Sequence, residues 1–447
     1  AERRSFTEAG RKEEGGDEPQ NRVRDQEPAG DVRQNRLVPR PPYAHSERNH
    51  EQGSHEIERN DERSRRRAGG AQLTHGLGRE AVAIQESPRK PIRRQIEQGS
   101  ENTAEEHDLQ PVHLAGSMGT GTATARAATA KKVSMAYNGP ADPEKNAVHL
   151  FAATFREYVE NRTDGRIQIV LYPDSQLGNE DERMELVSDR LLQINVASYA
   201  GMAPIIPELF AASIPFLFDS YAAAHKFFDE GEYWRKIQAL FQKRTGSILL
   251  EAVEEGEFLA FTNSKRELKS PKDFAGLKFR AMDSSQVALY KSFGASGAPI
   301  PWTEVYMALQ TGVADGQMNP PMYIIIGSLY EVQKYMTLAN IQYSDQFLVV
   351  NGDWFNSLSK QDQDIVRRAA HEANIITRAD VEARGDERVK FIASRGVKVY
   401  DPTVAEMNQF RQTGQPSYIA WLKGQIGKEW IDTAMNDAAW ANREVKK

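Results

Sequence analysis

From Lys132 onward the sequence predicts an α/β protein, and the order of its local patterns leads to that prediction. Short apolar runs alternate with helical patterns, in the order strand, helix, strand, helix, strand. This order is typical of parallel strands with helices on both faces of the sheet. The 447 residues are enough for two or three domains.

The first elements follow from local signals. Residues 133–137 form an apolar strand pattern, and Asp142 with Pro143 reads as a helix cap followed by proline at the first helical position. Apolar residues then recur every four positions, which gives one helix face. The next elements are expected at 167–171 (strand), 180–192 (helix) and 194–200 (strand).

The remaining elements are predicted in the same way. Helices are expected at 220–230, 232–244, 284–294, 303–312 and 321–335, with strands at 247–253, 258–262, 277–282, 336–342 and 347–351. In these patterns Ser284 or Ser285 caps one helix and Thr303 caps the next. Ser359, with Asp362 three residues later, opens a helical pattern that reaches about residue 395. A helix of this length either bridges two lobes or breaks near Gly385.

Composition excludes several classes of protein. The 57 basic and 63 acidic residues give a formal net charge of −6, so there is no overall basic field for nucleic acid. The chain has no cysteine, which excludes disulfides and thiolate metal sites. No apolar run is long enough for a transmembrane helix. No dinucleotide or Walker motif is found, and no metal or cofactor site is expected.

The first 130 residues have a different texture. Residues 1–117 contain two aromatic residues and no sustained hydrophobic period, so disorder is expected, and the arginine-rich composition suggests a spurious extension. Residues 118–130 are similar to the tail of a secretory signal that ends at Ala128-Thr129-Ala130. A flexible linker is the alternative.

The stretch 276–320 holds the main candidate binding residues: Arg280, Trp302 and Asn319. A guanidinium, an indole and a carboxamide suit a small organic anion, and none is a nucleophile or a proton donor near neutral pH. Each also has a simpler interpretation. Arg280 could pair with Asp283, Trp302 could belong to the core, and Asn319 could form a turn before Pro320.

Five motifs in order resemble those of TRAP-transporter solute-binding proteins of the DctP-like family. They are YPDSQLG at 172–178, IPFLF at 214–218, GLKFR at 276–280, ALQTGVADGQ at 308–317 and Asn319-Pro320. The resemblance covers about residues 131–440. It implies a periplasmic-binding-protein-like fold with two α/β lobes around a ligand cleft. We expect one lobe from 131–255 plus 345–385, a second from 256–344 plus 386–447, and the long helix as a bridge.

The resemblance also implies the function. It indicates a periplasmic, monomeric protein without cofactor that captures an organic-acid anion and delivers it to a sodium-coupled permease. Such a protein is not an enzyme and is not inserted in the membrane. The alternatives are an α/β enzyme that anchors a carboxylate substrate, and a binding protein that serves a chemoreceptor.

Site residues are carried over from the matching motifs. The resemblance implies that Arg280 pairs with the ligand carboxylate, Trp302 packs on the ligand and Asn319 contacts the carboxylate. It implies that Gln346 lines the same cleft and that Glu180 faces the ligand. Asp283 could accept from a ligand hydroxyl or amine, but pairing with Arg280 or capping the next helix is the simpler role. Some relatives place a second arginine within 256–261, where this chain reads GEFLAF, so a second fixed cation is in doubt.

Overall fold

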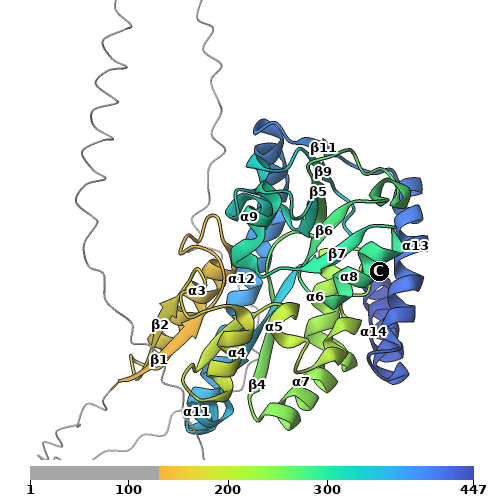
Figure 1. Ribbon diagram of the computed structural model, residues 1–447. Helices are drawn as coiled ribbons and strands as arrows, with labels where there is room; N and C mark the ends of the chain where they lie inside the picture. Colours follow the sequence, from red (N-terminus) through yellow and green to blue (C-terminus); the bar gives the residue numbers. More distant parts are fainter. Residues whose placement is uncertain (1–129) are drawn as a thin grey trace, which may run out of the picture. The chain divides into compact units, whose positions relative to one another are not determined.

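The computed structural model describes residues 130–447; the predictions for residues 1–117 and 118–129 lie outside this range. Two mixed sheets with helices around them form the described part (Figure 1). The α/β prediction is confirmed. Within residues 130–447, no helix has both the length and the apolar character that a membrane crossing requires.

The first sheet has the strand order β2-β1-β3-β10-β4. Strands β1 and β2 are parallel, as are β1 and β3, which agrees with the predicted start of the chain. Strand β10 enters antiparallel to both of its neighbours, so the sheet is mixed. The strands are β1 Lys131–Ala136, β2 Ile167–Tyr172, β3 Ile194–Ala197, β4 Ile248–Glu254 and β10 Asp345–Val350.

The helices associated with this sheet come from the first half of the described chain, apart from one short helix that follows β10. They are α3 Ala147–Arg162, α4 Glu180–Ser188, α5 Tyr199–Met202, η1 Pro207–Ala211, α6 Tyr221–Glu230, α7 Glu232–Thr245 and, after β10, α11 Gly352–Asn356. The sequence suggested Asp142 as the cap of α3, and this prediction is wrong. Asn146 does, because its side chain accepts a hydrogen bond from the backbone N–H of Val148 at 3.1 Å.

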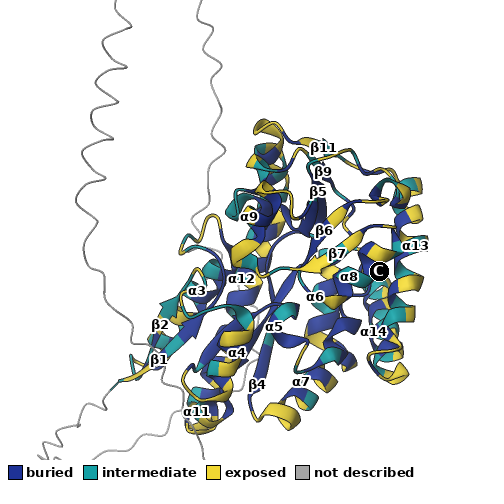
Figure 2. Ribbon diagram, in the orientation of Figure 1, coloured by how far each residue is buried: buried dark blue, intermediate teal, exposed yellow. Residues whose placement is uncertain are grey.

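The second sheet has the order β11-β9-β5-β8-β6-β7. Its strands are β5 Ala260–Asn263, β6 Lys278–Ala281, β7 Ser296–Pro299, β8 Gly316–Asn319, β9 Tyr335–Thr337 and β11 Lys398–Tyr400. Strand β7 lies at the edge and is largely exposed (Figure 2). The short elements around this sheet are η2 Pro271–Phe274, α8 Ser284–Ser292, η3 Trp302–Glu304, α9 Val305–Gln310, α10 Pro321–Ile326 and η4 Leu329–Glu331.

Three helix predictions in this half are wrong. Thr303 is no helix cap, because it lies inside η3 and Glu304 is the N-cap of α9. Asp283, rather than Ser284 or Ser285, is the N-cap of α8. The predicted helix 321–335 consists of α10, η4 and the start of β9, because the left-handed backbone conformation of Ser328, with φ of 50°, interrupts the helix.

Helix α12 (Lys360–Ser394) runs for 35 residues through Gly385 without a break and contacts elements of both sheets. Ser359 caps it as predicted, accepting from the backbone N–H of Asp362 at 3.0 Å. The last helices, α13 Val404–Leu422 and α14 Lys428–Glu444, return along α8 and along α6 and α7, respectively.

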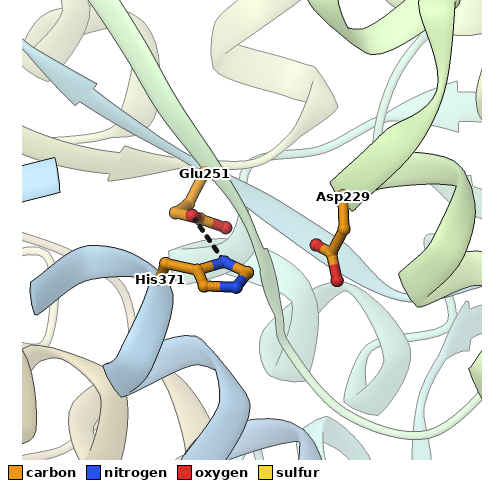
Figure 3. A group of neighbouring side chains, drawn as sticks. All are labelled: Asp229, Glu251 and His371. Carbon is orange, nitrogen blue, oxygen red and sulfur yellow. Dashed lines mark hydrogen bonds and ion pairs between the residues drawn. The ribbon is translucent and has the colours of Figure 1, made fainter. Parts of the chain in front are cut away.

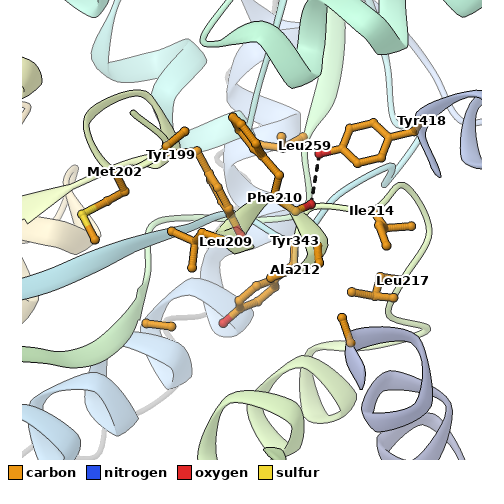
Figure 4. Packing of buried hydrophobic residues seen from close by; sticks show 14 of the residues in the cluster. Tyr199, Met202, Leu209, Phe210, Ala212, Ile214, Leu217, Leu259, Tyr343 and Tyr418 are labelled. Carbon is orange, nitrogen blue, oxygen red and sulfur yellow. Dashed lines mark hydrogen bonds between the residues drawn. The ribbon is translucent and has the colours of Figure 1, made fainter. Parts of the chain in front are cut away.

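The largest apolar cluster connects the two sheets. In Figure 4 residues of the α5–η1 region pack beside Leu259 and Tyr343, which lie on the segments that cross between the sheets. Tyr418 of α13 joins them and donates its hydroxyl to the carbonyl of Phe210 at 3.2 Å. The two halves therefore share a core at their junction.

Candidate functional site

The described part has two halves, one built around each sheet, and a cleft of about 380 Å³ lies between them. The first half contributes residues that follow β1, β2 and β3, whereas the second contributes residues of β6, η3, β8 and α10. Four of the six predicted site residues line this cleft: Glu180, Arg280, Trp302 and Asn319. Gln346 and Asp283 are not part of its lining.

Arg280 is the one positively charged residue among those that line the cleft, and only 3% of its surface is exposed. Its Nε donates to the carbonyl of Ile300 at 2.9 Å, which fixes the guanidinium on strand β6. Its Nη1 is buried and has no hydrogen-bond partner among the described residues. Burial lowers the pKa of Arg280, although nearby Tyr290 and acidic groups oppose this. A buried guanidinium with a free donor is a suitable partner for a carboxylate.

Trp302 and Asn319 line the same cleft as Arg280, from η3 and β8. The half-buried ring of Trp302 lies 5.0 Å from that of Tyr323, centroid to centroid, at an angle of 69°. Trp302 also packs against the apolar core under α9 and α10, so it has both a cleft and a core face. Asn319 ends β8, and its amide donates to Gln317.

Glu180 lines the cleft, but its carboxylate already accepts several hydrogen bonds. Oε1 accepts from Asn138 Nδ2 at 2.5 Å and from the backbone N–H of Ser198 at 3.2 Å. Oε2 accepts from the backbone N–H of Gly201 at 3.2 Å and from the hydroxyl of Ser198. This carboxylate therefore holds the segment after β1 against α4 and α5.

Asp283 and Gln346 occupy supporting positions. Asp283 Oδ1 accepts from the backbone N–H groups of Ser285 and Gln286 at 2.8 and 3.3 Å. This is the capping role that the sequence favoured. Gln346 Nε2 donates to Glu255 Oε1 at 2.6 Å and to the hydroxyl of Tyr323 at 3.0 Å. Gln346 thereby positions two groups that do line the cleft.

Glu255 is the functional candidate that the sequence reasoning missed. It lines the cleft with only 8% of its surface exposed. Besides the bond from Gln346, its Oε2 accepts from the hydroxyl of Ser344 at 2.8 Å. Burial raises the pKa of Glu255 to about 7. The available signal was Glu254-Glu255-Gly256-Glu257, a dense acidic group directly after an apolar strand.

A separate cluster of Asp229, Glu251 and His371 has the residue types of a metal site (Figure 3). Nδ1 of His371 lies 3.3 Å from Glu251 Oε1. However, Arg378 donates to both oxygens of Asp229, at 2.7 and 2.9 Å. Because a guanidinium already neutralises this carboxylate, the cluster is best described as an ion-pair network between α6, β4 and α12.

A family model and several known proteins match this chain in sequence. The family model DctP, bacterial extracellular solute-binding protein, family 7, matches residues 139–424. The ectoine-binding periplasmic protein TeaA of Halomonas elongata is 32% identical over 296 residues, which are 65% of this chain and 85% of that protein. The sialic acid-binding periplasmic protein SiaP of Vibrio cholerae is 30% identical over 297 residues, or 66% and 89%.

Solved structures show the same fold. The sugar acid binding protein of Advenella mimigardefordensis in complex with galactonate matches with a TM-score of 0.65 and 28% identity, over 70% of this chain and 99% of that one. A TRAP periplasmic solute binding protein of Polaromonas bound to D-erythronate matches with a TM-score of 0.63 and 29% identity, over 68% and 98%.

Proposed function

The chain belongs to family 7 of the bacterial extracellular solute-binding proteins, the periplasmic binding proteins of TRAP transporters, and we propose that Arg280 is its ligand anchor. In this proposal the protein captures an organic-acid anion in the cleft and delivers it to a sodium-coupled permease. A protein of this family binds its solute without converting it. The class of anion follows from the relatives, which include binders of galactonate, D-erythronate and C4-dicarboxylates.

The observation that carries the proposal is the free, buried Nη1 of Arg280. A buried donor without a partner costs roughly 1–3 kcal/mol, and more when the group is charged. A ligand carboxylate would remove that cost and form two parallel hydrogen bonds with the guanidinium. Trp302 would supply an apolar wall, and Asn319 a directional hydrogen bond.

Ligand capture by closure follows from the two-sided lining of the cleft. A ligand that touches both halves stabilises only the arrangement in which both are near, so closure results from differential affinity. The mouth of the cleft already has one bond between the halves: the Thr303 hydroxyl donates to Asn179 Oδ1 at 3.1 Å. We assign 131–255 plus 345–385 to one lobe and 256–344 plus 386–447 to the other. Helix α14 of the second lobe packs against α6 and α7 of the first.

Calorimetry with the full chain tests the role of Arg280, using galactonate, D-erythronate, ectoine and succinate as probes. We expect Arg280→Ala to weaken carboxylate binding by a factor of tens to thousands, because truncating one partner of a buried charge pair costs about 2–5 kcal/mol. Arg280→Lys should also bind poorly, since an ammonium cannot form the planar fork.

The control is Arg411→Ala, which removes a half-exposed arginine on α13 that is not part of the cleft lining. It should bind like the wild type. Affinity within threefold of the wild type in Arg280→Ala would remove Arg280 from the site. A binding protein for a chemoreceptor remains the alternative to a permease partner, and uptake assays in a strain without the permease distinguish the two.

A further inference from the structure

We propose that Glu255 selects the ligand: the cleft accepts a compound with one carboxylate and, on the side of Glu255, a hydrogen-bond donor, either a hydroxyl or an ammonium-type group. A second carboxylate at that position is disfavoured. This inference rests on the proposed function, because it assumes that Arg280 anchors the first carboxylate. It goes further by naming the chemistry of the other end of the ligand.

The charges of the cleft lining are the first argument. Among the described residues that line the cleft, Arg280 is the one cation, whereas Glu180, Asp181 and Glu255 are acidic. A dicarboxylate would bring its second negative charge toward acidic groups without a fixed cation to receive it. Like charges brought together inside a cleft oppose binding strongly. The lining therefore favours a ligand with a single negative charge.

The surroundings of Glu255 are the second argument. Its side-chain hydrogen-bond donors among the described residues are Ser344 and Gln346, both of them neutral. Neither supplies the positive charge that a buried carboxyl group usually has beside it. An ionised carboxylate has about four acceptor positions, so these two side-chain donors leave room for a ligand. A hydroxyl or an ammonium group would complete the set.

The third argument is the position of Glu255 relative to the anchor. Arg280 lies on β6 of the second sheet, whereas Glu255 directly follows β4 of the first. Glu255 is nevertheless close enough that its charge influences the pKa of Arg280, raising it against the effect of burial. The two groups thus form a pair of opposite charges within one cleft, and the rings of Trp302 and Tyr323 line the same space. Such a cleft matches a ligand with a carboxylate at the Arg280 end and a hydrogen-bond donor at the Glu255 end.

Competition between three probes tests the inference. Calorimetry with the full wild-type chain at about pH 9, where Glu255 is ionised, compares succinate, D-erythronate and ectoine. Succinate has a second carboxylate, D-erythronate has hydroxyl donors, and ectoine carries a cationic donor. We expect D-erythronate or ectoine to bind at least about tenfold more tightly than succinate. Which of the two binds identifies the donor.

Glu255→Gln is the matching variant, because it removes the charge and keeps the shape. We expect the preference over succinate to fall about tenfold or more in this variant. It should stay unchanged in Glu185→Gln, which changes an exposed glutamate of α4 that does not line the cleft. Thermal denaturation checks that each variant is folded. If Glu255→Gln does not fold, the affinities of the wild type for the three probes alone decide whether the inference holds.

The outcomes separate this inference from the proposed function. Succinate that binds wild type as tightly as the other two probes, or a preference that is unchanged in Glu255→Gln, would overturn the inference. If Arg280→Ala still abolishes carboxylate binding in that case, the proposed function stands without it. If wild type binds none of the three probes, the result contradicts both.

Discussion

The raised pKa of Glu255 predicts a specific pH dependence of stability. In the folded protein burial raises the pKa of Glu255 from 4.5 to about 7. A carboxyl group with a raised folded-state pKa contributes most to stability below its unfolded pKa, and this contribution is lost as the pH rises through the folded value. The difference between these two pKa values corresponds to roughly 3 kcal/mol of stability, because each tenfold change in proton affinity is worth about 1.36 kcal/mol.

Glu255→Gln removes this titration. We therefore expect the ligand-free variant and the wild type to have similar free energies of unfolding below about pH 4.5. The variant should then become progressively more stable than the wild type, by roughly 3 kcal/mol at about pH 8. The variant would be the more stable protein although it lacks a hydrogen-bonded carboxylate, because that carboxylate is buried without a cation beside it.

Urea denaturation of the full chain across this pH range measures the difference. Glu185→Gln, at an exposed position on α4, serves as the control and should give a difference from the wild type that does not change with pH. A Glu255→Gln difference that is equally flat would refute the reasoning, since it would mean that Glu255 titrates alike in the folded and unfolded chains.

Three further outcomes are expected. Ligand titration should change the tryptophan fluorescence of wild type but not of Trp302→Phe, and an unchanged signal in that variant would place Trp302 in the core alone. Gly352→Ala should lower the Tm by many degrees, because the added Cβ would lie 1.7 Å from the carbonyl oxygen of Gly246. Thr303→Val should speed ligand dissociation roughly fivefold in stopped-flow measurements, because it removes the bond to Asn179 across the cleft mouth, worth about 1 kcal/mol.

Local signals predicted the α/β class and placed Arg280, Trp302 and Asn319 in one region of the chain. Helix α12 is the clearest case, since its cap and its pattern are both local and the structure confirms both. The caps of α3 and α8 were assigned to neighbouring residues, because several side chains near a helix start are able to cap it and only the backbone path decides.

Glu255 could not be identified in this way because its properties come from distant residues. Its partners Ser344 and Gln346 lie 89 and 91 positions away in the sequence. The antiparallel entry of β10 between β3 and β4 brings them there, and no periodicity in 345–350 reveals that strand order. Burial, and with it the shifted pKa, follows from this long-range pairing.

The two segments that cross between the sheets lie side by side. The backbone N–H of Glu255 donates to the carbonyl of Ser344 at 3.0 Å, and that of Leu259 donates to the carbonyl of Gln342 at 2.9 Å. In any rotation of one sheet against the other about this paired ribbon, atoms near the axis move least and atoms far from it move most. In the proposed closure, Glu255 would lie near such an axis, whereas Trp302 would lie on a wall that moves. An entering molecule would then meet the carboxyl group at a place that moves little, before the walls come together.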